Sequence, residues 1–160
     1  MKNKLVLAAL AAALLCGLAF TACKNDVLDV KVVYDKANTV SNLKAVKNGT
    51  DIIVTWDAAD DAGGYVVYSK KDGTKQVSNI SHGGGGSPTV ENGKIYKDDG
   101  SLDASAKYNP DKYSFVYPIP SPLPSGAEGD YLIGVQTYPL SEGGNVAPSD
   151  IVWSPAVAIE

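Results

Sequence analysis

The sequence predicts an all-β fold: one antiparallel β-sandwich of about seven strands that follows an N-terminal export signal. Three observations favour this fold. Short segments alternate apolar and polar residues, as in DIIVTWD at 51–57. Turn-forming pairs such as Asn48-Gly49 separate these segments. After Phe20, no segment has the apolar spacing of an amphipathic helix.

The first twenty-two residues have the features of a secretory signal peptide. A basic start, MKNK, leads into an uncharged run of 16 residues from Leu5 to Phe20. A membrane-spanning helix needs roughly 20 apolar residues, so this run is short for a permanent anchor. The small residues Thr21 and Ala22 then suit a signal peptidase. The sequence therefore predicts that 1–22 is removed on export.

The residues around the cleavage point, Phe20-Thr21-Ala22-Cys23, resemble the lipobox of bacterial lipoproteins. The resemblance implies that the Cys23 thiol receives a diacylglyceryl group, that the signal is cut before this cysteine, and that the new amine is acylated. Phe20 departs from the family, which usually has leucine at that position. Lys24 stands next to the cysteine in place of aspartate, which by resemblance to lipoprotein sorting favours the outer membrane. We therefore expect a lipid-anchored protein of the cell envelope, with the membrane as a partner.

Composition excludes several classes of function. Removal of 1–22 leaves 138 residues with 12 lysines and 18 acidic residues, a net charge of −6, and the chain has no arginine. Without a basic surface or bidentate arginine contacts, we expect no nucleic-acid partner. Cys16 follows two leucines rather than small residues, so it is the poorer lipidation candidate and leaves with the signal. The folded domain then has no free thiol or disulfide, and we expect no cofactor and no metal.

The mature chain divides into a tether and one domain. Residues 23–39 contain the lipidated cysteine and a tether with room for a lead-in strand, and 40–160 form the sandwich. Between the third and fourth strands, 77–112 loses the strand pattern and contains a glycine-rich run and several turns, among them 109–111. We interpret 77–112 as an insertion, in which 90–96 can form a short hairpin around Asn92-Gly93. The strands are expected at 40–47, 51–57, 65–70, 113–117, 131–138 and 151–159.

The order of these features resembles that of a fibronectin type III domain. Trp56 closes the second strand, Tyr65 lies in the third strand after a turn, and Leu123-Pro124-Ser125-Gly126 with Tyr131 resembles the tyrosine corner. The gap to Tyr131 and the 77–112 insertion are longer than in the family. The resemblance covers about 40–159 and implies an immunoglobulin-like sandwich. Strand alternation places the following residues in its core: Ile52, Val54, Trp56, Tyr65, Val67, Tyr131, Ile133 and Val135.

Candidate ligand-binding residues come from aromatic side chains outside the expected core. These side chains can stack on sugar rings, or they can be ordinary strand residues that pair across a sheet. The candidates are Tyr108, Tyr113, Tyr117, Tyr138 and Trp153. His82, the single histidine, lies beside four glycines and is interpreted as an exposed loop residue. The acidic run 98–103 can be a loose calcium loop, but it lacks EF-hand spacing and is better explained as a solvated turn, and the second acidic turn, with Asp57, Asp60 and Asp61, is interpreted in the same way. No activated nucleophile or converging carboxylate pair is evident, so no catalytic residue is assigned.

These observations predict a membrane-anchored, non-catalytic binding or adhesion module whose partner is a protein or a glycan. The alternative is a carbohydrate-binding accessory domain that uses the tyrosine and tryptophan side chains, and a hydrolase is the least favoured class. We expect the 77–112 insertion to carry the binding surface, because insertions on rigid scaffolds often do. Deletion of 82–97 is expected to leave the fold intact, since shortening a surface loop has a small effect on stability.

Overall fold

The computed structural model describes residues 34–81, 88–140 and 145–160. In these ranges every regular element is a β-strand, and there is no helix long and apolar enough to cross a membrane. The all-β prediction is therefore confirmed for the described part of the chain. The expected signal peptide, Cys23 and the segment up to residue 33 lie outside the described residues, as does His82.

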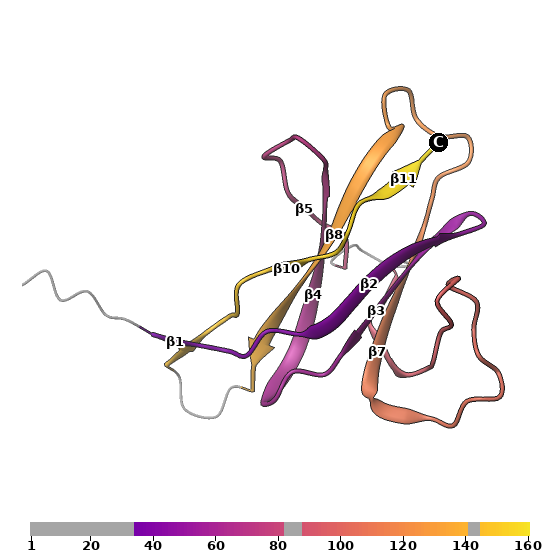
Figure 1. The fold of residues 1–160 in the computed structure, drawn as a ribbon. Helices are drawn as coiled ribbons and strands as arrows, with labels where there is room; N and C mark the ends of the chain where they lie inside the picture. Colours follow the sequence, from indigo (N-terminus) through magenta and orange to yellow (C-terminus); the bar gives the residue numbers. More distant parts are fainter. Residues whose placement is uncertain (1–33, 82–87, 141–144) are drawn as a thin grey trace, which may run out of the picture. The chain divides into compact units, whose positions relative to one another are not determined.

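One antiparallel sheet has the strand order β2-β3-β7-β6, and Figure 1 shows its three longer strands side by side. β2 and β3 are joined by a tight turn with Gly49 at a φ of 60°, which is the hairpin that the Asn48-Gly49 pair predicts. The strands of this sheet are β2 (Ser41–Asn48), β3 (Asp51–Asp57), β7 (Asn109–Pro118) and β6 (Glu91–Gly93).

The second sheet has the order β10-β8-β4-β5, and β11 also pairs with β8. The last predicted strand, 151–159, is split into β10 and β11 on either side of Pro155, which has no N–H to donate to a ladder. β1 and β9 form a separate parallel pair. These elements are β4 (Ala62–Lys71), β5 (Ser78–Asn79), β8 (Gly129–Pro139), β10 (Val152–Trp153), β11 (Val157–Ile159), β1 (Asp35–Lys36) and β9 (Val146–Ala147).

The core contains alternate residues of β3, β4, β7 and β8, so that side chains of both sheets meet in one cluster. Tyr65 and Tyr131 are half-buried and pack against this cluster, which Phe115 of β7 also joins. The other six predicted core residues are at most 1% exposed: Ile52, Val54, Trp56, Val67, Ile133 and Val135. The two sheets therefore form a sandwich around the side chains that the alternation selects.

The 77–112 insertion is not a loop throughout, and this expectation is corrected. β5 pairs with β4, β6 pairs with β7, and β7 already begins at Asn109, where a turn was expected. Glu91 of β6 is in register with Ser114, and Asn92 with Tyr113. Deletion of 82–97 would remove β6 from its sheet, so the fold contradicts the expected tolerance to that deletion. A short hairpin was expected at 90–96 with Asn92-Gly93 as its turn; instead both residues belong to β6, which pairs with β7.

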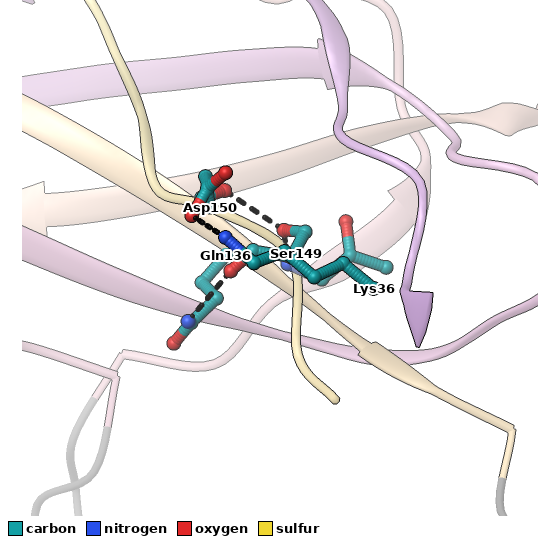
Figure 2. Close-up of polar contacts among 5 residues, drawn as sticks. Lys36, Gln136, Ser149 and Asp150 are labelled. Carbon is teal, nitrogen blue, oxygen red and sulfur yellow. Dashed lines mark hydrogen bonds and ion pairs between the residues drawn. The ribbon is translucent and has the colours of Figure 1, made fainter. Parts of the chain in front are cut away.

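The segment that leads into the domain is fastened at β1. β1 runs parallel to β9, and the backbone N–H of Ala37 donates to the carbonyl of Ala147 at 2.9 Å. Lys36 forms an ion pair with Asp150 at 2.5 Å, which Figure 2 draws. The lead-in chain is therefore held beside β9, near the C-terminal end of β8. β11 pairs with the opposite end of β8, which starts at Gly129.

Asp150 is itself held on β8 through its neighbour Ser149, which is buried. The Ser149 hydroxyl accepts the backbone N–H of Thr137 at 2.9 Å and donates to the carbonyl of Asp150 at 2.8 Å. The Ser149 carbonyl accepts the side-chain amide of Gln136 at 2.8 Å (Figure 2). These bonds attach the segment between β9 and β10 to the edge of β8. The backbone of Asp150, the partner of Lys36, is therefore held in place.

Two adjacent glycines of β4 are expected to respond differently to alanine. A methyl group on Gly63 would lie 2.6 Å from the carbonyl oxygen of Pro139 and 2.9 Å from backbone atoms of Leu140, whereas Gly64 has nothing within 4 Å. We expect Gly63→Ala to lower the free energy of unfolding by roughly 1–3 kcal/mol, as overpacking does, and Gly64→Ala to change it by less than about 0.5 kcal/mol. Urea unfolding followed by circular dichroism measures both. Equal losses would contradict the close approach of the two backbones.

Candidate functional site

The five aromatic residues expected to bind a ligand do not form one platform. Tyr113 and Tyr117 share a face of β7 with the buried Phe115, and both are half-buried against the core. Tyr113 stacks on Trp56 with ring centroids 6.1 Å apart. Their position in the strand alternation turns both rings towards the core, although Tyr113 also borders the pocket described below.

The other three aromatic residues lie in two separate places. Tyr108 is 67% exposed, and its ring lies over Gly93 of β6. Tyr138 is exposed, and Trp153 is half-buried on the outer face of the second sheet, where it is in register with Gly134 of β8. The ammonium group of Lys70 is 4.3 Å from the Trp153 ring centroid, a cation–π distance. One face of that ring is therefore already occupied.

The acidic run 98–103 is a hairpin turn whose carboxylates have protein partners. Asp98 pairs with Lys44, while Asp99 and Asp103 each accept two hydrogen bonds from the serine two residues further along. These bonds lower the pKa of all three carboxyl groups below the ordinary value. Within the described ranges, no group of three or more metal-ligating side chains could hold an ion. The interpretation as a solvated turn agrees with these contacts.

A pocket of about 300 Å³ opens on the outer face of the β2-β3-β7-β6 sheet. Its floor is β3, where Ile53, Thr55 and Asp57 alternate with the core residues and point away from the core. The strand register places Lys44 of β2 beside Thr55 and Lys112 of β7 beside Asp57. The floor is therefore built from three neighbouring strands.

The wall of the pocket is a small hairpin, residues 95–103, which follows β6. The backbone N–H of Asp103 donates to the carbonyl of Ile95, and that of Lys97 donates to the carbonyl of Ser101, both at 2.9 Å. Between these bonds Tyr96 pairs with Leu102 as an isolated bridge. The hairpin and the residue before it contribute the following lining residues: Lys94, Ile95, Tyr96, Lys97, Asp98 and Gly100.

This 95–103 hairpin is fastened onto the sheet at three points. The Lys44 ammonium group pairs with Asp98 at 2.7 Å, and the side-chain amide of Asn48 donates to the backbone of the turn at 3.2 Å. Gly100, at a φ of 80°, lies so close to Ile53 that a methyl group on it would be 3.3 Å from that side chain. Ile53 is only 7% exposed although it faces outward. The hairpin therefore covers part of the sheet and leaves the pocket beside it.

Asp57 is the acceptor at the floor of the pocket. Its carboxylate accepts a hydrogen bond from the side-chain amide of Asn42 at 2.7 Å and forms an ion pair with Lys112. Burial raises the pKa of Asp57, but the hydrogen bonds from Lys112 and Asn42 and the charge of Lys112 lower it further than burial raises it. The pKa of Asp57 is therefore below its ordinary value, and the group is an ionised acceptor at neutral pH.

The pocket combines hydrogen-bond donors, hydrogen-bond acceptors and apolar surface. Carboxylate oxygens accept, ammonium groups donate, and the Asn42 amide and Thr55 hydroxyl can do both. The polar lining residues are Asn42, Lys44, Thr55, Asp57, Lys94, Lys97, Asp98 and Lys112, and the apolar and aromatic ones are Val46, Ile53, Trp56, Ile95, Tyr96 and Tyr113. Its volume is at the lower end of the range for small-molecule sites. Such a lining suits one small polar ligand that also has an apolar face.

Sequence reasoning indicated the wall of this pocket and one lining residue of β7, Tyr113, and missed the polar residues of the floor. The wall belongs to the 77–112 insertion, but Asn42, Lys44 and Thr55 are ordinary polar residues on the outer side of two strands. A signal for the floor was present, because polar residues that alternate along both strands of a predicted hairpin must share one face of the sheet. Nothing in the sequence indicated that the insertion would fold back over that face.

Comparison of the chain with known protein families, with curated proteins and with solved structures finds no match.

Proposed function

We propose that the protein is a lipid-anchored, non-catalytic binding module of the cell envelope, and that its binding surface is the pocket between β3 and the 95–103 hairpin. One observation carries the proposal: a segment of the insertion is fixed onto the outer face of the sheet by an ion pair, an amide hydrogen bond and a close glycine contact. Side chains that are already held in place lose little entropy when a ligand binds.

The anchored part of the proposal is supported by the sequence Phe20-Thr21-Ala22-Cys23 and by the fastening of β1. Residues 24–34, eleven in number, separate the cysteine from the first described strand at Asp35. Eleven residues can span at most about 40 Å. A lipid on Cys23 would therefore keep the domain close to a bilayer, and the pairing of β1 with β9 sets the end of the domain to which the tether connects.

We further propose that the sandwich is immunoglobulin-like and of the fibronectin type III kind. The orders β2-β3-β7-β6 and β10-β8-β4 correspond to the A-B-E-D and G-F-C sheets of immunoglobulin-like domains. The hydroxyl of Tyr131 donates to the carbonyl of Ala127, four residues upstream, at 3.0 Å, which is the bond of a tyrosine corner.

Non-catalytic binding is supported by the ionisation state of the two carboxylates that line the pocket. Asp57 and Asp98 are each paired with a lysine, and both have a lowered pKa, owing to hydrogen bonds that outweigh burial. A glycoside hydrolase needs one carboxyl group with a raised pKa that can deliver a proton. This pocket instead holds both groups ionised, which favours hydrogen bonding to a ligand over proton transfer.

The proposal is tested by the retention of a soluble chain on immobilised fractions of bacterial envelope and extracellular material. Every described strand lies after Val33, so a chain that starts at Lys24 keeps the sandwich. We expect retention on the polysaccharide or the protein fraction, and Thr55→Trp, which fills the floor of the pocket, should weaken it by about tenfold or more. Biolayer interferometry measures this retention.

Thr89→Trp is the matched control, because Thr89 is exposed, belongs to the same insertion and does not line the pocket. This variant should bind like the unmodified chain. Circular dichroism of both variants verifies that the sandwich has folded. If both tryptophan variants bind as the unmodified chain does, or if neither fraction retains the unmodified chain, the pocket is not the binding surface and the proposal fails.

A further inference from the structure

Building on this proposed function, we propose that the pocket takes a saccharide unit with two adjacent hydroxyl groups, bound at Asp57 and covered by the Tyr96 side of the hairpin. Of the aromatic residues that the sequence suggests as sugar platforms, only Tyr113 borders this pocket, whereas Trp153 and Tyr138 lie on the other sheet. The inference depends on the arrangement of donors and acceptors on the pocket floor.

Asp57 stands between two donors, so its surroundings match a pair of hydroxyl groups. The carboxylate accepts from Asn42 at 2.7 Å and from Lys112, which are donors from β2 and β7 on the two sides of β3. A hydroxyl group both donates and accepts. One hydroxyl group of a diol can therefore donate to a free lone pair of the Asp57 carboxylate. The same hydroxyl or the adjacent one can accept from the Asn42 amide or the Lys112 ammonium group. Every polar group of the floor then still has a hydrogen-bond partner.

The charges of the lining disfavour simple ions as ligands. A metal cation would meet four lysine ammonium groups in the lining, and a small anion at the floor would lie against Asp57, which is ionised, although Lys94 and Lys97 of the wall are not paired with the carboxylates of the floor. Bringing either ion to the floor would separate an existing ion pair without supplying a replacement. A neutral polyol interacts with both members of each pair and separates neither.

The hairpin supplies the apolar surface that the carbon side of a sugar ring needs. Ile53 on the floor and Ile95 and Tyr96 on the wall line the pocket together with the polar groups. The bridge to Leu102 holds the backbone of Tyr96 in the hairpin, and Tyr96 lines the wall of the pocket. A sugar ring presents hydroxyl groups around its edge and C–H groups on its faces, and contact of those faces with aromatic and aliphatic side chains adds hydrophobic stabilisation.

The test is binding of the soluble chain to an array of immobilised neutral oligosaccharides, with a duplicate array oxidised by periodate, which cleaves adjacent hydroxyl pairs. We expect binding to a subset of the sugars and loss of that binding on the oxidised copy. Asp57→Asn should weaken binding by about tenfold or more, as removal of a charged hydrogen-bond partner does. Asn42→Ala, which leaves the Asp57–Lys112 pair in place, should weaken it in the same direction.

Two aromatic substitutions locate the site. Tyr96→Ala should weaken sugar binding, whereas Tyr108→Ala, at a 67% exposed tyrosine of the same insertion, should not. Thermal unfolding of each variant separates loss of binding from loss of the fold. Unchanged binding by folded Asp57→Asn and Tyr96→Ala variants overturns the inference, and so does loss of binding only on Trp153→Ala or Tyr138→Ala.

The outcomes also separate this inference from the proposed function. One outcome is that the chain binds no sugar on the array but is retained by the protein fraction, and that Thr55→Trp abolishes this retention. That result overturns the saccharide inference but supports the pocket as the binding surface. If Thr55→Trp changes binding to neither sugars nor proteins, both are overturned. Periodate-sensitive binding that Asp57→Asn, Tyr96→Ala and Thr55→Trp all weaken supports both.

Discussion

Replacement of Trp56 by alanine is expected to lower the free energy of unfolding by about 3–5 kcal/mol, as deletion of a large buried aromatic side chain does. Trp56 is 1% exposed at the end of β3. Its ring meets Tyr65 of the opposite sheet edge-on, with centroids 5.5 Å apart, and stacks on Tyr113. Small domains are stable by about 5–15 kcal/mol in total, so this one substitution removes a large part of the margin.

The second tryptophan provides the matched control. Trp153 is half-buried on the outer face of the second sheet, with Lys70 above its ring. We expect Trp153→Ala to cost about 1–2 kcal/mol, from partial burial and the cation–π contact. Urea unfolding should be followed by circular dichroism, because each variant lacks one fluorescent side chain. A loss under about 1 kcal/mol for Trp56→Ala would show that Trp56 is not part of the core.

The Trp56→Phe variant separates the effect of ring volume on stability from the effect of the buried indole N–H. The indole N–H of Trp56 is buried and has no hydrogen-bond partner among the described residues. An unpaired buried donor is unfavourable by about 1–3 kcal/mol. Phenylalanine removes that donor and keeps a ring between Tyr65 and Tyr113, so its effect should be clearly smaller than that of alanine. A loss as large as that of Trp56→Ala would indicate that the indole N–H has a partner in solution.

The sandwich could be predicted from the sequence because its central strands carry their own pattern. The segment expected as a strand at 51–57 is β3 with the same bounds, and 131–138 lies within β8. In both, one face is buried and the other is partly exposed, which forces the alternation of apolar and polar residues. A buried pattern of that kind is visible in the sequence without knowledge of the partner strand.

The fold of the insertion and the polar floor of the pocket could not be predicted, because both depend on contacts between residues distant in the sequence. The Lys44–Asp98 ion pair joins residues 54 positions apart, and no periodicity links them. A turn was expected at 109–111, but Pro110 lies where β7 has not yet begun to pair with β3, so its missing N–H disrupts no bond to that strand. Pairing of a three-residue strand such as β6 is decided by the tertiary structure rather than by local preference.

Replacement of Cys23 by serine is expected to abolish fatty-acid labelling and to leave a precursor that retains residues 1–22. The expectation follows from the lipobox resemblance, in which the thiol is the group that carries the diacylglyceryl chains and cleavage depends on that modification. Each buried methylene contributes about 0.8 kcal/mol, so two or three acyl chains give lasting attachment, whereas one chain alone binds only marginally. Metabolic labelling with a fatty acid and partitioning into detergent measure the two effects.

Cys16 gives this experiment an internal control, because it is the only other cysteine in the chain. It follows Leu14 and Leu15 within the apolar run, where the small residues required before a cleavage site are absent. Cys16→Ser should therefore be labelled and cut like the unmodified chain. Labelling of the Cys23→Ser protein would show that the anchor is attached elsewhere. If instead only Cys16→Ser lost the label, the mature chain would begin seven residues earlier, and the tether before β1 would be longer by that number.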